Sequence, residues 1–185
     1  KWANEIAQKR QDFQVELVDI ADYNLPLLDE PMPPMMNQYT KGHTKKWSSK
    51  IAEADGYIFV TGEYNHSIPG AFKNAVDFLN FEWKNKSIGF ISYGSNGGDR
   101  AVEHWRGVAG ELNMADVREQ LILNLQSDFE NWSTFKPTEQ HEAQFNKVLD
   151  QVVSWATALQ PVRSLKWLEK LPDQAVVRQP IKVSI

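Results

Sequence analysis

Apolar residues recur along the chain with two different spacings, and these spacings predict its secondary structure. Apolar positions at helical spacing predict helices over residues 2–10, 43–54, 70–81, 99–113 and 138–159. Short apolar or alternating runs predict strands over residues 13–20, 57–61, 87–93 and 117–125. Thr138 follows Pro137 and is placed to cap the last helix. Because helices and strands alternate strictly, we expect one parallel sheet with helices on both faces.

Two segments with several prolines lie outside this alternation. Residues 21–42 carry four prolines and predict a long loop. Its methionines, Met32, Met35 and Met36, either cover a ligand or a partner surface or simply pack on the surface. Residues 161–185 carry three prolines and predict an extension that packs on the body or on a second subunit. We therefore divide the chain into a domain over residues 1–160 and a C-terminal extension over residues 161–185.

Composition narrows the classes of function. The 185 residues suffice for one domain with a full hydrophobic core. A net charge of −4, with no stretch dominated by Lys and Arg, argues against nucleic-acid binding. The absence of cysteine excludes disulfides and thiolate chemistry and is compatible with a cytoplasmic location. The four histidines lack metal-ligand spacing, and no apolar run reaches the roughly 20 residues that span a bilayer, so we expect no metal and no membrane insertion.

Two loops that leave strand carboxyl ends have unusual composition, and in a parallel sheet this is the edge where ligands bind. Residues 61–70 combine an aromatic ring at Tyr64 with the Asn65 amide and hydroxyl groups, which suits a flat heteroaromatic ligand. An ordinary polar loop that caps the next helix explains the same residues equally well. Residues 92–100 contain three glycines, which allow close approach of a ligand or merely give a flexible turn.

A family resemblance decides between these alternatives. The segment Thr61-Gly-Glu-Tyr-Asn-His-Ser-Ile-Pro-Gly-Ala-Phe-Lys-Asn-Ala-Val-Asp77 closely resembles the signature of the NADPH-dependent FMN reductase family. Ser92-Tyr-Gly-Ser-Asn-Gly-Gly-Asp-Arg-Ala101 looks like the second flavin loop of that family, and residues 17–28 match the segment after its second strand. The resemblance covers about residues 1 to 160.

The resemblance implies a flavodoxin-like three-layer sandwich with strand order 2-1-3-4-5 and FMN across the carboxyl edge. Hydride would pass from NADPH or NADH through the flavin to an acceptor such as a quinone, azo compound, flavin or metal oxyanion, without a dedicated catalytic side chain. It also implies a homodimer or homotetramer, with Trp83 and Trp105 at the interface or packed within the monomer. The implied cofactor-binding residues are Glu63, Tyr64, Asn65, His66, Ser67, Ser92, Tyr93, Gly94, Ser95, Gly97 and Gly98.

The chain departs from the family pattern in two places. Gly62 stands where the family usually has proline. The Gly-Ser-x-Arg loop, which holds the FMN phosphate between the first strand and first helix of the family, is absent. We therefore expect the sheet to lack its first strand, which leaves main-chain groups unpaired between the second and third strands. We also expect roughly 20–30 residues to precede Lys1, the length of a strand, a loop and a helix start.

Other functions fit some of these observations. A flavodoxin-type electron carrier would bind the same cofactor, although such carriers tend to be strongly acidic and lack the Glu-Tyr-Asn signature. A family member that has lost its flavin and serves as an interaction module would explain the missing phosphate loop. Arg100 and Lys73 are either phosphate contacts or solvated surface residues, and Trp132 and Phe135 lie in a predicted loop over residues 127–136 that is a candidate to overhang a neighbouring flavin.

Overall fold

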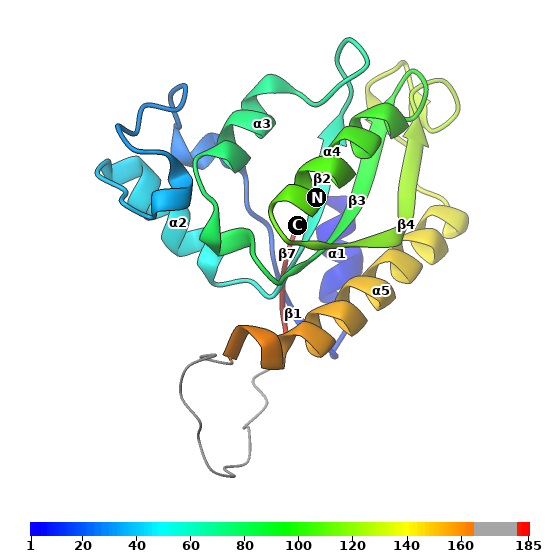
Figure 1. Cartoon of the computed structure of the whole chain (residues 1–185). Coiled ribbons are helices and arrows are strands. Elements are labelled where there is room, and N and C mark those ends of the chain that lie inside the picture. The colour runs from blue at the N-terminus through cyan, green and yellow to red at the C-terminus, as the bar shows by residue number, and fades with distance from the viewer. Residues whose placement is uncertain (165–180) are drawn as a thin grey trace.

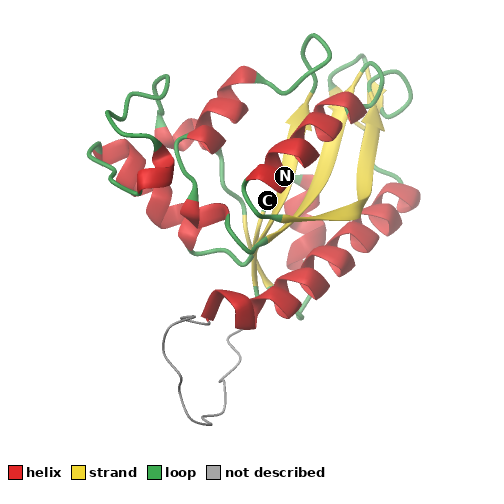
Figure 2. Ribbon diagram, viewed as in Figure 1, coloured by secondary structure: helices red, strands yellow, loops and turns green. Residues whose placement is uncertain are grey.

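The computed structural model describes residues 1–164 and 181–185 of the chain, which form a parallel five-stranded sheet between two layers of helices (Figures 1 and 2). The strand order is β1-β7-β2-β3-β4. The strands are β1 (Gln14–Glu16), β2 (Gly56–Gly62), β3 (Ser87–Gly94), β4 (Ala115–Asn124) and β7 (Lys182–Ser184). The three-layer parallel architecture that the periodicity predicts is confirmed.

Helices cover both faces of the sheet, and each face has its own apolar core. The first face carries α1 (Trp2–Gln8) and α5 (Glu139–Ser164), whose apolar stripes pack on Ile58 and Ile91. The second face carries α2 (Gly42–Ala52), α3 (Gly70–Asp77) and α4 (Asp99–Glu111). Trp83 and Trp105 are buried in this second core, which confirms packing within the monomer rather than exposure at an interface. No helix in the described part of the chain combines the length and apolar character needed to cross a membrane.

The place predicted to be empty in the sheet is filled by the C-terminal residues. β7 lies between β1 and β2 and is parallel to both, where order 2-1-3-4-5 puts the first strand. The backbone N–H of Gln14 donates to Ile181 O at 2.8 Å, and that of Asp55 donates to Lys182 O at 2.7 Å. The expectation of an open gap with unpaired main-chain groups is therefore wrong. Residues 181–185, which the sequence places in an extension, belong to the central sheet, while residues 165–180 lie outside the described part of the chain.

Side chains strengthen the attachment of β7. Val183 is fully buried in the first core, opposite Val15 of β1. Lys182 forms ion pairs with Glu16 at 3.0 Å and with Glu53 at 2.7 Å, and Lys50 joins the same two carboxylates. These charges are partly exposed and contribute little each, so most of the attachment comes from the strand pairing and the buried valine.

Several predicted boundaries shift for identifiable reasons. β1 ends at Glu16 because the chain enters a 3₁₀ turn, η1 (Ile20–Tyr23), which the Asp19 carboxylate caps by accepting from Ala21 N–H. α3 ends at Asp77, before the further 3₁₀ turn η3 (Phe81–Trp83), and η2 (Pro34–Met36) interrupts the predicted long loop. The predicted loop over 127–136 contains a small hairpin, β5 (Phe129–Glu130) and β6 (Thr134–Phe135), around a turn in which Asn131 and Trp132 have positive φ. Thr138 caps α5 as predicted, because its hydroxyl accepts from His141 N–H.

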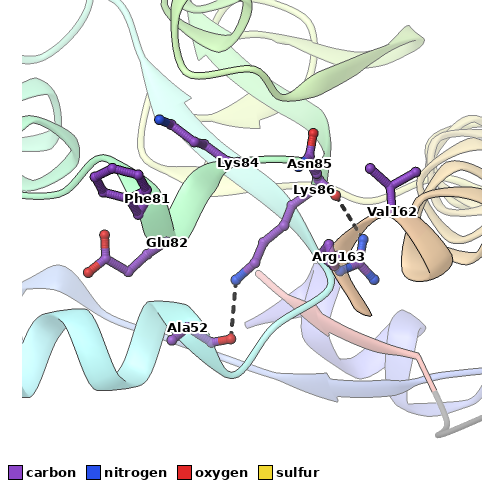
Figure 3. Close-up of a pocket in the computed structure, with 8 residues that line it drawn as sticks. All are labelled: Ala52, Phe81, Glu82, Lys84, Asn85, Lys86, Val162 and Arg163. Carbon is purple, nitrogen blue, oxygen red and sulfur yellow. Dashed lines mark hydrogen bonds between the residues drawn. The ribbon is translucent and has the colours of Figure 1, made fainter. Parts of the chain in front are cut away.

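A buried lysine anchors the start of β3 at the amino edge of the sheet. Lys86 Nζ donates to Ile51 O, to Ala52 O and to the Tyr57 hydroxyl at 2.9–3.2 Å, and Figure 3 draws the hydrogen bond to Ala52. Burial lowers the pKa of Lys86 to about 8 and raises the pKa of Tyr57 well above its ordinary value. A pocket of about 430 Å³ lies beside it, with Arg163 on its far wall donating to Asn85 O (Figure 3). This pocket is at the opposite edge of the sheet from the predicted ligand loops.

Substitution Val183→Ala tests the contribution of β7. It removes two buried methyl groups from the first core, so we expect the free energy of unfolding to fall by roughly 2 kcal/mol. Val60→Ala is the matched control, because that side chain is 44% exposed and its loss should cost much less. Urea denaturation of both variants measures the difference. Equal stabilities for V183A and V60A would contradict the central placement of β7.

The lowered pKa of Lys86 predicts how stability depends on pH. Between the folded-state pKa of about 8 and the ordinary lysine pKa of 10.5, the unfolded chain holds a proton that the folded chain has released. Raising the pH through this window therefore favours the folded state, by roughly 1.5 kcal/mol between pH 8 and 9.5. The variant Lys86→Met should lack this rise. Parallel urea titrations of the two proteins at several pH values measure it, and a flat profile for the unaltered chain would contradict the lowered pKa.

Candidate functional site

The two predicted ligand loops meet at the carboxyl edge of the sheet. β2 ends at Gly62 and β3 ends at Gly94, and in the register of this parallel pair Gly62 lies opposite Tyr93. The loops that follow are therefore neighbours, and Figure 1 shows them side by side above the sheet. A Cβ atom on Gly62 would lie 3.3 Å from the Tyr93 ring, so a larger residue would crowd the contact between the two strands.

The first loop is built around a tight turn. Tyr64 and Ser67 exchange two main-chain hydrogen bonds, at 3.1 and 3.0 Å, around Asn65 and His66. Both central residues have positive φ, 48° and 71°, which is the conformation of a type I′ turn. The turn projects from the sheet and leaves Tyr64 73% exposed. It therefore presents one aromatic ring and one amide side chain at the open edge.

Helix α4 holds the first loop from behind. The Glu63 carboxylate accepts from the backbone N–H and from the guanidinium of Arg100, each at 3.2 Å, and the Glu63 side chain is largely buried. The Ser67 hydroxyl lies 2.9 Å from His104 Nδ1. Arg100 therefore serves this loop rather than a phosphate in the structure. The sequence contains no signal for His104, because it lies 37 positions from Ser67.

The second loop is a glycine turn that reaches from β3 to the start of α4. Gly97 N–H donates to Gly94 O at 3.0 Å, and Gly97 and Gly98 have positive φ, 78° and 74°. A Cβ atom on Gly98 would lie 2.7 Å from Tyr93 O, and one on Gly97 would lie 2.1 Å from Ile122. Glycine is therefore required at both positions for the loop to adopt this shape. Gly94, Gly97 and Gly98 are all buried against neighbouring protein atoms, so these glycines serve the packing of the loop itself.

The remaining predicted residues of the second loop are distributed over three environments. Ser95 is exposed, and its carbonyl accepts from the Asn124 side chain at 3.1 Å. Ser92 is fully buried, and its hydroxyl has no hydrogen-bond partner among the described residues. Tyr93 projects to the opposite face of the sheet, where its partly exposed ring lies 6.5 Å from that of Phe129. Residues that are adjacent in the sequence motif therefore point their side chains in different directions, as the alternation of side chains along a strand requires.

A hollow lies where the resemblance places the phosphate loop. Residue Ile185, which follows β7, and residue Lys1, which precedes α1, both line a pocket of about 410 Å³ at the carboxyl edge. Its other walls are mostly apolar and include Trp2, Val60 and Tyr93. Among the described residues, Lys1 is its only charged lining group. Lys73, the other candidate phosphate contact, pairs instead with Asp77 at 2.6 Å.

Comparison with known proteins agrees with the fold. A solved structure, the flavoenzyme NAD(P)H:(acceptor) oxidoreductase FerB from Paracoccus denitrificans, superposes with a TM-score of 0.63 at 19% identity, covering 84% of this chain and 86% of that one. The sheet order and this superposition therefore define a flavodoxin-like α/β fold. The family model for NADPH-dependent FMN reductases matches residues 1–128, and this chain belongs to that family.

Relatives of known name match the same region. The chain is 50% identical over 106 residues to NAD(P)H-dependent FMN reductase ntnL of Nectria sp, an alignment covering 54% of this chain and 53% of that protein. It is 41% identical over 129 residues to an NAD(P)H-dependent FMN reductase of Schizosaccharomyces pombe, covering 69% of this chain and 64% of the relative. The chain thus spans about half to two thirds of the length of these relatives.

Substitution Gly98→Ala tests the glycine turn. The new Cβ would meet a backbone oxygen, and the residue would keep a positive φ, so we expect a loss of about 2 kcal/mol or more in the free energy of unfolding. Gly107→Ala is the matched control on α4, because nothing lies within 4 Å of its Cβ position. It should instead stabilise the helix by about 0.5–1 kcal/mol. Thermal or urea unfolding compares the two, and a stable G98A protein would contradict the geometry of this loop.

Proposed function

We propose that this chain carries the flavin site of an oxidoreductase that takes hydride from NADPH or NADH and passes electrons to a small acceptor. The observation that supports this most directly is that the two motif loops follow neighbouring strands at one edge of the sheet, with Tyr64 exposed on the first loop. Bound FMN would supply the hydride-accepting N5 atom. No side chain is assigned a catalytic role, since the protein contributes position and electronics.

The residues present fit the ring end of FMN. Tyr64 offers an aromatic face and Asn65 an amide, and both residues are exposed on the tight turn. The proposed ring-binding set comprises Glu63, Tyr64, Asn65, His66 and Ser67 from one loop and Ser92, Tyr93, Gly94, Ser95, Gly97 and Gly98 from the other. Within it, Glu63 and Ser67 support the turn, because their side chains already engage α4.

The phosphate end of FMN has no matching loop in the described residues. The hollow between β7 and α1 is lined mainly by apolar groups, and the sequence contains no Gly-Ser-x-Arg segment. A phosphate prefers several backbone N–H groups and a cationic side chain, and Lys1 alone supplies only the second of these. We therefore assign no phosphate-binding residue, and the proposal rests on the contacts to the flavin ring.

The acceptor is proposed by class. Relatives of this chain are named NAD(P)H:quinone oxidoreductase, from Solanum tuberosum, and FMN-dependent NADPH-azoreductase, from Staphylococcus saprophyticus. Quinones and azo compounds, together with free flavins and metal oxyanions, are flat or compact acceptors that an open edge admits. We further propose that the protein works in the cytoplasm. We also propose that it forms a homodimer, which is supported by the largely exposed apolar side chains of Leu27 and Met35 in the loop before α2.

The experiment is a flavin titration followed by reduction. We expect protein mixed with FMN and desalted to keep the visible flavin absorbance, to lose it on anaerobic addition of NADPH or NADH, and to regain it when a quinone is added. Colour that neither nicotinamide bleaches would favour the electron carrier. Protein that retains no colour would overturn the proposal and favour an interaction module without flavin.

Substitution Tyr64→Ala tests the aromatic contact. Because aromatic stacking contributes about 0.5–1.5 kcal/mol, the dissociation constant for FMN should rise roughly 3- to 10-fold. Tyr64→Phe keeps the ring and should bind like the unaltered protein. Quenching of flavin fluorescence measures both constants. Equal affinity of Y64A and the unaltered chain would contradict the stacking role.

A further inference from the structure

Two side-chain contacts join the first loop to one face of α4. The Glu63 carboxylate accepts hydrogen bonds from the backbone N–H and from the guanidinium of Arg100. The Ser67 hydroxyl lies 2.9 Å from His104 Nδ1. Residues 63 and 67 flank the tight turn on either side, while residues 100 and 104 are one helical turn apart and so share a face of α4. The loop is therefore clamped at both ends by two neighbouring side chains of a single rigid helix.

Between these contacts, the His66 ring of the turn also lies 6.4 Å from the His104 ring. His66 occupies the left-handed region at φ 71°, which costs a residue with a side chain on the order of 1 kcal/mol. Tyr64, Asn65 and His66 are all exposed, so burial does not compensate for this cost. The two main-chain hydrogen bonds of the turn fix its internal shape but not its position relative to the rest of the site.

The same helix also carries the opposite wall. α4 begins directly after Gly97 and Gly98, whose backbone forms the glycine turn. The Glu63 Cβ lies only 3.6 Å from the Cβ position of Gly94, so the inner end of the first loop is already seated against that wall. The outer end, after the turn, is held through the hydroxyl of Ser67, and the next residue, Ile68, packs on the second core. Of these two contacts, it is the Ser67 hydroxyl that joins the outer end to α4, the helix that carries the opposite wall.

We propose that His104 is a positioning residue that acts through Ser67 to set the width of the flavin-ring site. This inference rests on the proposed function, because it assigns His104 to the same edge. His104 holds the turn and does not contact the ring. A serine hydroxyl donates to an unprotonated Nδ1 or accepts from a protonated one, so the contact survives either state of the imidazole. The role is geometric, and it does not require His104 to titrate.

The test is a double-mutant cycle on the protein without and with flavin. Ser67→Ala and His104→Ala each remove one partner, and the S67A/H104A pair removes both. His104→Asn should restore the contact, because its Nδ2 and Oδ1 atoms branch from Cγ as Nδ1 does. Glu111→Ala, at an exposed position near the far end of α4, is the matched control. Hydrogen exchange of the Tyr64 and Ser67 amides reports the turn directly.

We expect S67A and H104A each to accelerate exchange of these two amides and to raise the FMN dissociation constant, by roughly 3- to 10-fold, the effect of one hydrogen bond. The double variant should show no more than either single variant, and H104N and E111A should match the unaltered protein. The midpoint of urea denaturation should change little in all of them, which separates a positioning role from a general structural one.

Contrary results would separate the two proposals. Unchanged amide exchange in S67A and H104A, or effects that add in the double variant, would overturn the role of His104. An unaltered protein that binds flavin, with S67A and H104A binding equally well, would also overturn that role and leave the proposed function standing. An unaltered protein that binds no flavin would overturn the proposed function and, with it, the part of His104 in flavin binding.

Discussion

The fold depends on one strand pairing: β7 inserted between β1 and β2. In the described sheet, β7 is the only strand paired with β1, so residues 14–16 join the main-chain hydrogen bonds of the sheet only through residues 182–184, while α1 packs on α5 and on the first core. The pairing joins the two ends of the chain in space, and Lys1 and Ile185 line the same hollow. Each backbone hydrogen bond contributes little net stability, but an unpaired interior strand edge would be costly, so this short strand has a large effect.

The ligand edge depends on a different part of the molecule. Register between β2 and β3 places Gly62 beside Tyr93, and α4 then connects the loop after β3 back to the loop after β2 through Arg100 and His104. All of these residues lie between positions 56 and 111, within a strand–helix–strand–helix unit whose second core includes Trp83 and Trp105. The ring end of the site is therefore local in sequence and rigidly supported, whereas the hollow beside it depends on both ends of the chain.

Most of the fold could be read from periodicity, because β2, β3, α4 and α5 are each long enough to show a clear pattern. The two edge loops could likewise be located, since the Glu63–Ser67 motif follows a buried strand. Two features could not. β7 spans three residues, Lys182 to Ser184, after a proline-containing stretch, and a short strand paired over more than 160 positions leaves no local signal. The contact of Ser67 with His104 is equally invisible, because a histidine on an exposed helix face is indistinguishable from a solvated one until the loop is placed.

The ring end of the proposed site and the hollow beside it would contribute differently to the binding of a flavin. The proposed ring contact of Tyr64 would be aromatic stacking, which favours a flat ligand with little regard to its substituents. Phosphate contacts would instead add charge recognition, and the apolar walls at Trp2 and Val60 do not provide it. Since the ring walls are held by α4 and the hollow by β7, a change at β7 should disturb the stability of the sheet far more than the geometry of the ring site. Stability and flavin affinity are thus separable properties of this chain, each governed by its own set of contacts.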